Sequence, residues 1–290
     1  MRALLDEYDD RTMVGEVGEG PRRALKVMEE YTSGKRLHMA YSFDLLGKDS
    51  SAPYLHGLMQ KFADKSQGGW PSWALANHDV ERVGSRWGGP ERNLQKLRLA
   101  AAFQMCLRGS PCLYQGDELG LPEADIAFED LQDPPGIAMW PEYKGRDGCR
   151  TPMPWASQAA DIGFGDGTTK AWLPYTEAYR PLAADVQERD VASHLNFYRQ
   201  LLQWRRTQPA LIHGEQTLLP VHPQVMAFVR EHAGQRVLCA FNFSEQTATL
   251  ALPADMQPAQ RLALPGLTGG SIADNALAFE PFGGLILHLA

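Results

Sequence analysis

The sequence predicts an α/β fold in which a parallel sheet is followed by a smaller antiparallel all-β module. Two observations support this prediction. Up to residue 210, short apolar runs alternate with stretches of helical periodicity, which is typical of strand–helix units. From Leu211 onward the apolar runs are short and separated by turn residues, which indicates a β-sandwich. We therefore expect residues 1–210 and residues 211–290 to form separate domains.

The first domain contains four predicted strand–helix units. The strands are expected at residues 12–17, 37–43, 73–77 and 112–115. Apolar side chains recur at helical spacing in residues 54–62, 93–107 and 191–206, and residues 21–31 are expected to form a short helical or irregular segment. Strands this short, without polar alternation, are expected where both faces of a sheet are buried. A (β/α)8 barrel needs eight units, so four units predict only part of such a barrel.

Two further stretches complete the predicted architecture. Residues 120–190 are rich in Pro, Gly, Trp and acidic side chains and are expected to be irregular. Irregular segments of this length are uncommon unless they serve a function. In the second domain, strands are expected at residues 225–229, 237–241 and 285–289.

Composition excludes several classes of function. The chain of 290 residues has a net charge of −7, and its basic residues are scattered, which argues against a nucleic-acid partner. Its four cysteines form no C-x-x-C pair, so we expect reduced thiols, no zinc site and no other bound metal. The charged N-terminus has no apolar signal region, and no run of about 20 apolar residues could span a membrane. These features predict a cytoplasmic protein without membrane association.

Acidic residues stand at the predicted carboxyl ends of two strands. Glu16 closes the first strand, and Asp79 follows the third, directly after His78. The carboxyl ends of the strands form the active face of a β/α barrel. Two carboxylates there suit glycoside hydrolysis, which needs a proton donor at the leaving oxygen and negative charge near an oxocarbenium-like centre. Taken singly, each acid is more typical of a structural role, such as a helix cap or a loop acid.

Four short motifs, in order, resemble those of a known family. They are V-G-E-V at residues 14–17, A-N-H-D at 76–79, Y-Q-G-D-E-L-G at 114–120 and K-G-R-D-G-C-R-T-P-M-P-W at 144–155. Together they resemble the α-amylase superfamily (glycoside hydrolase family thirteen), and the fourth is similar to its α-glucosidase and oligo-1,6-glucosidase branch. The resemblance covers essentially the whole chain. It implies the C-terminal half of a (β/α)8 barrel, strands five to eight, followed by a β-sandwich.

The resemblance also implies roles for individual residues. Glu16 would be the general acid/base, and Asp79 would stabilise the transition state and bind sugar hydroxyls. His78 would hydrogen-bond the sugar, and Arg150 would lie at the substrate entrance, although an ordinary salt bridge remains open for Arg150. The implied activity is retaining hydrolysis of short α-glucosides or maltooligosaccharides. No cofactor is implied.

The chain departs from the family pattern at one essential position. The family's nucleophile is an Asp in a G-F-R-x-D type motif on the fourth strand, and no such motif occurs here. Asp9 and Asp10 precede the first strand, at its opposite end from Glu16. Six extended residues span about 20 Å, whereas a retaining pair of carboxyls lies about 5–5.5 Å apart. We therefore expect a fragment that lacks the nucleophile and needs the missing N-terminal half for activity.

Three alternatives remain open at this stage. A transglycosylase or isomerase of the same superfamily would carry the same motifs. A non-catalytic, glucosidase-like interaction protein would share the fold. A glycan-binding β-module would use only the second domain. A fourth question concerns calcium, since acidic residues cluster in one loop, but their spacing does not match an EF-hand and favours a solvated loop: Asp125, Glu129, Asp130 and Asp133.

Overall fold

The computed structural model describes residues 1–18, 23–65, 69–264, 266–273 and 275–290. These residues form two compact units. The first, called here the sheet unit, consists of Met1–Ala74, Leu99–Cys112 and Leu201–Ala290. The second, called the loop unit, consists of Leu75–Arg98 and Leu113–Gln200. Each unit is described separately below.

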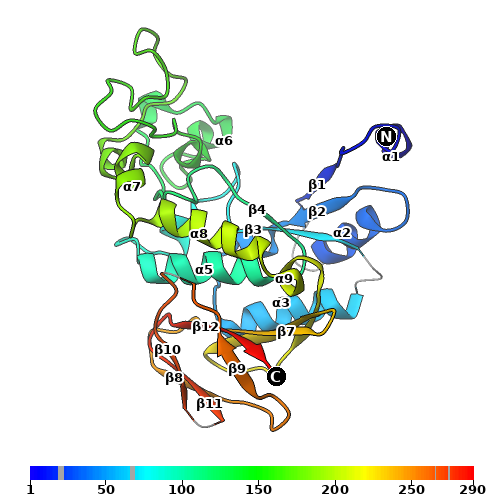
Figure 1. Cartoon of the computed structure of the whole chain (residues 1–290). Helices are drawn as coiled ribbons and strands as arrows, with labels where there is room; N and C mark the ends of the chain where they lie inside the picture. The colour runs from blue at the N-terminus through cyan, green and yellow to red at the C-terminus, as the bar shows by residue number, and fades with distance from the viewer. Residues whose placement is uncertain (19–22, 66–68, 265, 274) are drawn as a thin grey trace. The chain divides into compact units, whose positions relative to one another are not determined.

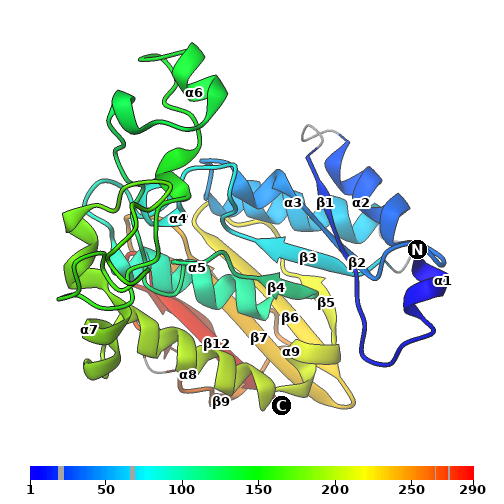
Figure 2. The same cartoon turned by 90° about the horizontal axis from the view of Figure 1, so that it is seen from above.

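A four-stranded parallel sheet forms one part of the sheet unit. Its strands are β1 (Val14–Val17), β2 (Met39–Ser42), β3 (Pro71–Ala74) and β4 (Ser110–Cys112), paired in the order β1-β2-β3-β4. All three pairings are parallel, and Figure 2 shows the strands in this order. The four predicted strands are therefore confirmed. Within the described residues, β1 and β4 each pair with a single strand.

Helices pack on this sheet through the apolar stripes that the sequence predicts. In α3 (Ala52–Lys65), Leu55, Leu58 and Met59 are almost fully buried. The other helical elements of the unit are α1 (Arg2–Leu5), α2 (Ala24–Thr32), η1 (Phe43–Leu46) and α9 (Pro209–His213). Residues 21–31, predicted to be either helical or irregular, contain most of α2, although residues 21 and 22 lie outside the described residues.

Two long helices pass from one unit to the other. These are α5 (Leu94–Cys106) and α8 (His194–Arg206), both predicted from their periodicity. Among the described helices, none has the length and apolar character needed to cross a membrane.

The C-terminal part of the sheet unit is an antiparallel sandwich, as predicted. One sheet has the order β5-β6-β7-β12-β9 and the other β10-β11-β8. Apolar side chains of both sheets, including Leu238, Leu277 and Leu287, form one buried cluster. The strands are β5 (Glu215–Leu218), β6 (Val225–His232), β7 (Gln235–Asn242), β8 (Ala248–Ala251), β9 (Pro258–Arg261), β10 (Gly270–Ala273), β11 (Ala276–Phe279) and β12 (Gly284–Leu289).

Aromatic packing joins the sandwich to the helices inside the sheet unit. The ring centroid of Phe103, in α5, lies 6.3, 5.8 and 5.4 Å from the ring centroids of Phe228, Phe241 and Phe243, respectively. The helix α3 contacts β5 and β6, and Figure 1 shows it above the larger sheet of the sandwich. The sandwich and the parallel sheet therefore share one continuous unit.

The loop unit contains the long irregular stretch and no strand among its described residues. A small apolar core, which includes Leu121, Ile126 and Tyr179, lies at its centre. Its short helical elements are α4 (Val83–Arg86), η2 (Phe128–Asp130), α6 (Pro134–Ala138), η3 (Asp147–Cys149), η4 (Glu177–Leu182) and α7 (Ala184–Arg189).

Two predicted strand ends are wrong. The sequence predicts the third strand at residues 73–77 and the fourth at residues 112–115, but β3 ends at Ala74 and β4 ends at Cys112. Local side-chain bonds turn the chain after each strand. Asn77 Oδ1 accepts from the backbone N–H of Asp79 at 2.9 Å, and Asp117 Oδ2 accepts from that of Tyr114 at 3.1 Å. Such local bonds between a side chain and the backbone compete with the strand ladder.

Candidate active site

Glu16 lies in β1, where the parallel register places it opposite Tyr41 of β2. Its side chain is exposed, and the Tyr41 hydroxyl donates a hydrogen bond to its Oε2. A carboxylate on an exposed part of the sheet, with one oxygen paired to a phenol, keeps its second oxygen open to a ligand. Glu16 therefore has the accessibility that proton transfer to a substrate requires.

The segment 77–79 lies near the start of the loop unit, shortly after the end of β3. Asn77 is 5% exposed, and its side-chain bond to the Asp79 N–H fixes a tight turn. The turn leaves the side chain of His78 54% exposed, with Nε2 3.5 Å from Asp79 Oδ1. The buried amide thus determines where the two neighbouring polar side chains lie.

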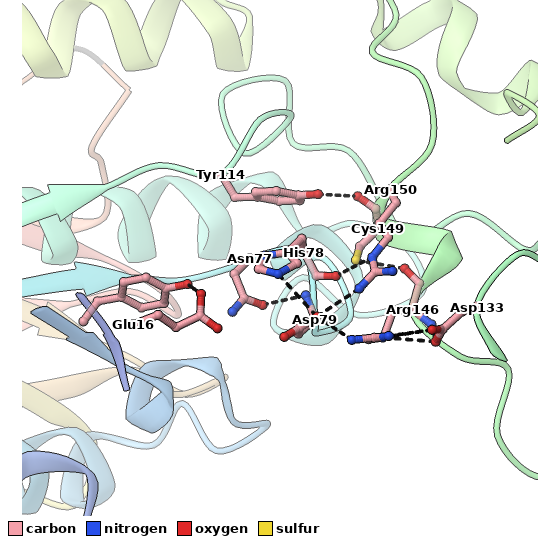
Figure 3. Close-up of polar contacts among 10 residues, drawn as sticks. Glu16, Asn77, His78, Asp79, Tyr114, Asp133, Arg146, Cys149 and Arg150 are labelled. Atoms are coloured by element: carbon pink, nitrogen blue, oxygen red, sulfur yellow. Dashed lines mark hydrogen bonds and ion pairs between the residues drawn. The ribbon is translucent and has the colours of Figure 1, made fainter. Parts of the chain in front are cut away.

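Two arginines converge on the same oxygen of Asp79, as Figure 3 shows. Arg146 Nη1 donates to Oδ1 at 3.0 Å, and Arg150 Nη2 donates to it at 2.9 Å. Arg150 Nε also donates to the carbonyl of His78 at 2.7 Å. Among the described residues, none donates a hydrogen bond to Asp79 Oδ2. The carboxylate is thus fixed through one oxygen while the other remains able to accept from a ligand.

The loop unit brings together three of the four predicted site residues, His78, Asp79 and Arg150. Glu16, the fourth, belongs to the sheet unit. The sequence did not single out Arg146, although it lies inside the quoted motif at residues 144–155. Its adjacency to Gly145 and Asp147 in G-R-D was the available signal.

Asp133 corrects the expectation of a solvated acidic loop. Asp125 and Glu129 are exposed, but the side chain of Asp133 is fully buried against Arg146. The hydrogen bonds that Asp133 accepts from Arg146 hold the pKa of Asp133 below its usual range and raise the pKa of Arg146. The exposed members of the loop fit the expectation, whereas Asp133 is linked to the site because its partner Arg146 also contacts Asp79.

Behind the site, the loop unit buries several ionisable side chains. Arg82 is 1% exposed, donates to the carbonyl of Gln115 at 2.7 Å and lies over the Tyr114 ring. Burial raises the pKa values of Asp117 and Glu123 to about 7 each, although the positive charge of Arg82 opposes the rise. The Tyr114 hydroxyl donates to the carbonyl of Cys149 at 2.9 Å.

Comparison with known families identifies both parts of the chain. Residues 1–214 match the α-amylase catalytic domain, and residues 216–286 match the C-terminal domain of maltogenic amylase. The chain therefore belongs to the α-amylase family, and the family resemblance of its four motifs is confirmed.

Curated relatives are named as glucosidases. The chain is 44% identical to a probable α-glucosidase of Rhizobium meliloti over 255 residues, 87% of this chain and 46% of that protein. It is 29% identical to an oligo-1,6-glucosidase of Parageobacillus thermoglucosidasius over 286 residues, 87% of this chain and 50% of that protein. The chain thus spans about half the length of the curated relatives it matches.

Solved structures agree on the fold. An α-glucosyl transfer enzyme superposes with a TM-score of 0.92 and 43% identity, over all of this chain and 53% of that one. A trehalulose synthase from Pseudomonas mesoacidophila superposes with a TM-score of 0.83 at 24% identity, which speaks to the fold alone. Partial coverage of each neighbour agrees with the predicted part of a barrel followed by an antiparallel module.

Proposed function

We propose that the chain supplies one part of a retaining α-glucoside hydrolase that acts on short α-glucosides or maltooligosaccharides. The observation that carries this proposal is the state of Asp79, whose Oδ1 is fixed by two guanidinium groups and whose Oδ2 can accept from sugar hydroxyls. A carboxylate held in this way keeps its negative charge and its orientation as positive charge develops on the sugar.

Each of the other site residues then has a defined role. Glu16 protonates the glycosidic oxygen as the leaving group departs and later removes a proton from water. His78 donates a hydrogen bond to the sugar beside Asp79. Arg150 supports both neighbours at once, because it donates to the His78 carbonyl and to the Asp79 carboxylate.

The nucleophile must come from outside these 290 residues, which hold no G-F-R-x-D type motif. We propose that the preceding half of the same enzyme supplies it, either in one polypeptide or as a separate chain. This half would also pair with the sheet edges at β1 and β4. The chain by itself is then expected to hydrolyse no α-glucoside.

A fusion protein tests the proposal. The N-terminal part of the Rhizobium meliloti relative, up to its counterpart of Met1, would be joined to this chain. The fusion should hydrolyse p-nitrophenyl α-glucoside and release α-glucose first, as NMR can follow. Glu16→Gln and Asp79→Asn should each lower kcat/KM by about 10³-fold or more, whereas Glu188→Gln, on an exposed ion pair with Arg199, should not. A folded but inactive fusion, or β-glucose as first product, would contradict the proposal.

Glucosyl transfer is a second candidate, favoured by the name of the α-glucosyl transfer enzyme that superposes on the whole chain. The two activities share the first half-reaction and differ in whether water or a sugar hydroxyl attacks second. Product analysis with added glucose or a primary alcohol separates them. If transfer products exceed released glucose at moderate acceptor concentration, the chain belongs to a transferase.

A further inference from the structure

Asp133 occupies the position that begins α6 but does not cap that helix. It is the residue before Pro134, where an aspartate side chain usually accepts from the first backbone N–H groups of the helix. Here Pro134 and Pro135 have no N–H to donate, and the side chain is instead fully buried against Arg146. The carboxylate of Asp133 therefore takes a partner that is distant in the sequence.

Asp133 accepts hydrogen bonds from three nitrogens of Arg146. The backbone N–H donates to Oδ2 at 3.0 Å, Nε donates to both oxygens at 3.1 and 3.2 Å, and Nη2 donates to Oδ1 at 2.6 Å. A two-point contact between guanidinium and carboxylate fixes the plane of the arginine. With two of its nitrogens held, Arg146 presents Nη1 to Asp79 at 3.0 Å.

A second carboxylate, that of Asp147, also joins the segment around Asp133 to the segment around Arg146. Asp147 Oδ2 accepts from the backbone N–H groups of Gln132 at 2.6 Å and Asp133 at 2.8 Å. Glycines permit the close approach, since a Cβ on Gly145 would lie 2.8 Å from Asp133 Oδ2, and one on Gly136 would lie 2.7 Å from the carbonyl of Lys144. We call this set of bonds among Asp133, Arg146 and Asp147 the clasp.

We propose that Asp133 is a positioning residue that, through Arg146, sets the orientation and the electrostatic environment of Asp79. The role rests on the proposed function, in which Asp79 stabilises an oxocarbenium-like transition state. Asp79 meets two guanidinium groups, and Asp133 balances the charge of one of them. Without Asp133, an unbalanced and mobile guanidinium would lie beside the point where positive charge develops on the sugar.

A spectroscopic test addresses the clasp in the chain itself, independently of catalysis. The Nε–H signal of Arg146, assigned by its loss in Arg146→Lys, should exchange slowly with solvent in the wild-type chain. Asp133→Asn should speed this exchange by at least about tenfold, because the charged acceptor is lost. The matched control is Asp125→Asn, which removes the exposed ion pair to Lys144 in the neighbouring turn and should leave the signal unchanged. An unchanged Arg146 signal in Asp133→Asn would overturn the proposal.

A kinetic test uses the active fusion. Asp133→Asn should lower kcat/KM by about 10- to 100-fold, the size expected when a catalytic group loses its alignment, with Asp125→Asn within about twofold of wild type. Because Asp133 acts through Arg146, the double variant Asp133→Asn/Arg146→Met should be no less active than Arg146→Met alone. Multiplying losses would instead indicate a separate structural effect and would overturn the proposal.

Two further outcomes remain decisive. If Asp133→Asn does not fold, Arg146→Lys replaces it, because this variant keeps the positive charge but loses the two-point contact. Its kcat/KM should fall by a similar factor. Full activity in the folded Arg146→Lys variant would refute the role of Asp133. If the wild-type fusion is inactive, the proposed function fails, while the exchange measurement on the chain still decides whether Asp133 holds Arg146.

Discussion

The two units of the chain are stabilised by different kinds of interior. In the sandwich of the sheet unit, most of the interior is a continuous apolar cluster, with Arg230 and Asn242 buried in β6 and β7, and strand ladders satisfy much of the backbone. In the loop unit the apolar core is smaller, and charged or polar groups such as Arg82, Asp133 and His194 are buried beside it. Apolar burial is tolerant of small changes in geometry, whereas buried charge requires each partner in place.

Side chains also replace the ladders as partners for the loop-unit backbone. Gln187 Nε2 donates to the carbonyls of Leu119 at 2.9 Å and Leu182 at 2.8 Å, and the Tyr179 hydroxyl donates to that of Pro122 at 2.6 Å. An irregular segment of this length can therefore hold site residues in fixed positions without regular secondary structure. The comparison predicts that single polar substitutions in the loop unit cost as much as core truncations in the sheet unit.

The largest expected effect is at Arg82. Arg82→Met would leave the carbonyl of Gln115 without its side-chain donor and remove the positive charge near the buried Asp117 and Glu123. The free energy of unfolding should fall by about 3–5 kcal/mol, as for other broken buried charge networks. Urea denaturation at pH 7 measures it. Arg189→Met, on an exposed pair with Asp185, should cost less than about 1 kcal/mol and serves as control. Equal losses at Arg82 and Arg189 would show that buried charge does not stabilise the loop unit.

Truncation of the sandwich core gives the counterpart in the sheet unit. Leu238 is fully buried in the apolar cluster, and Leu238→Ala should lower the free energy of unfolding by about 2–5 kcal/mol through lost burial and a residual cavity. Val221→Ala, at a side chain that is 61% exposed, should change it by less than about 0.5 kcal/mol. The same urea titrations measure both. A loss below about 1 kcal/mol at Leu238 would show that apolar packing is not what stabilises this unit.

A pH-dependent prediction concerns His194. Burial, reinforced by Arg98 and Arg92, lowers the pKa of His194 to about 3, below the ordinary value of 6.5. Between these values the unfolded chain binds the proton and the folded chain does not, so acidification from pH 6.5 towards 4 destabilises the fold at this residue.

The variant His194→Leu isolates this contribution. Asp117 and Glu123 titrate in the same range, but they are present in both proteins and largely cancel in the difference. The stability of the variant relative to wild type should rise by up to about 1.4 kcal/mol per pH unit as the pH falls from 6 to 4. Urea titrations at several pH values measure the slope. Parallel curves would mean that His194 becomes charged in the folded protein.

The same contrast explains how much could be predicted from the sequence. The four parallel strands and the sandwich follow from local apolar periodicity, which is a property of neighbouring residues. His78 and Asp79 lie in a short motif after a strand and Arg150 lies in a motif of the irregular stretch, so the family resemblance of these motifs could single them out. The strand ends at Ala74 and Cys112 were missed because the side chains of Asn77 and Asp117 bind the backbone and turn the chain.

The part of the site that could not be predicted depends on contacts between distant residues. Asp133 and Arg146 form a salt bridge across an irregular stretch. Such a stretch has no apolar periodicity from which the buried side chains could be predicted. In sequence, Asp133 looks like its exposed neighbours Asp125 and Glu129. The nearest signals in the sequence are D-P-P-G at residues 133–136 and G-R-D at residues 145–147. Their glycines, Gly136 and Gly145, lie where the two backbone segments approach each other closely.

The smallest predicted effect compares two glycines with the same backbone conformation. Gly145 in the loop unit has φ +77°, and Gly234 in the turn between β6 and β7 has φ +84°. Gly234→Ala meets no atom within 4 Å, so it should cost only about 1 kcal/mol for the left-handed backbone. Gly145→Ala carries the same backbone cost and also places a Cβ 2.8 Å from Asp133 Oδ2 and 2.9 Å from the Gly136 Cα.

The extra cost at Gly145 should bring its total to about 2–3 kcal/mol, measured by urea denaturation of both variants. The loss should also appear in the clasp, as faster exchange of the Arg146 Nε–H, whereas Gly234→Ala should leave that signal unchanged. Because backbone strain is common to both positions, only the difference between them reports on Asp133. Equal costs would mean that Asp133 and α6 move aside without penalty, and the loop unit would then be as tolerant of change as the hairpin.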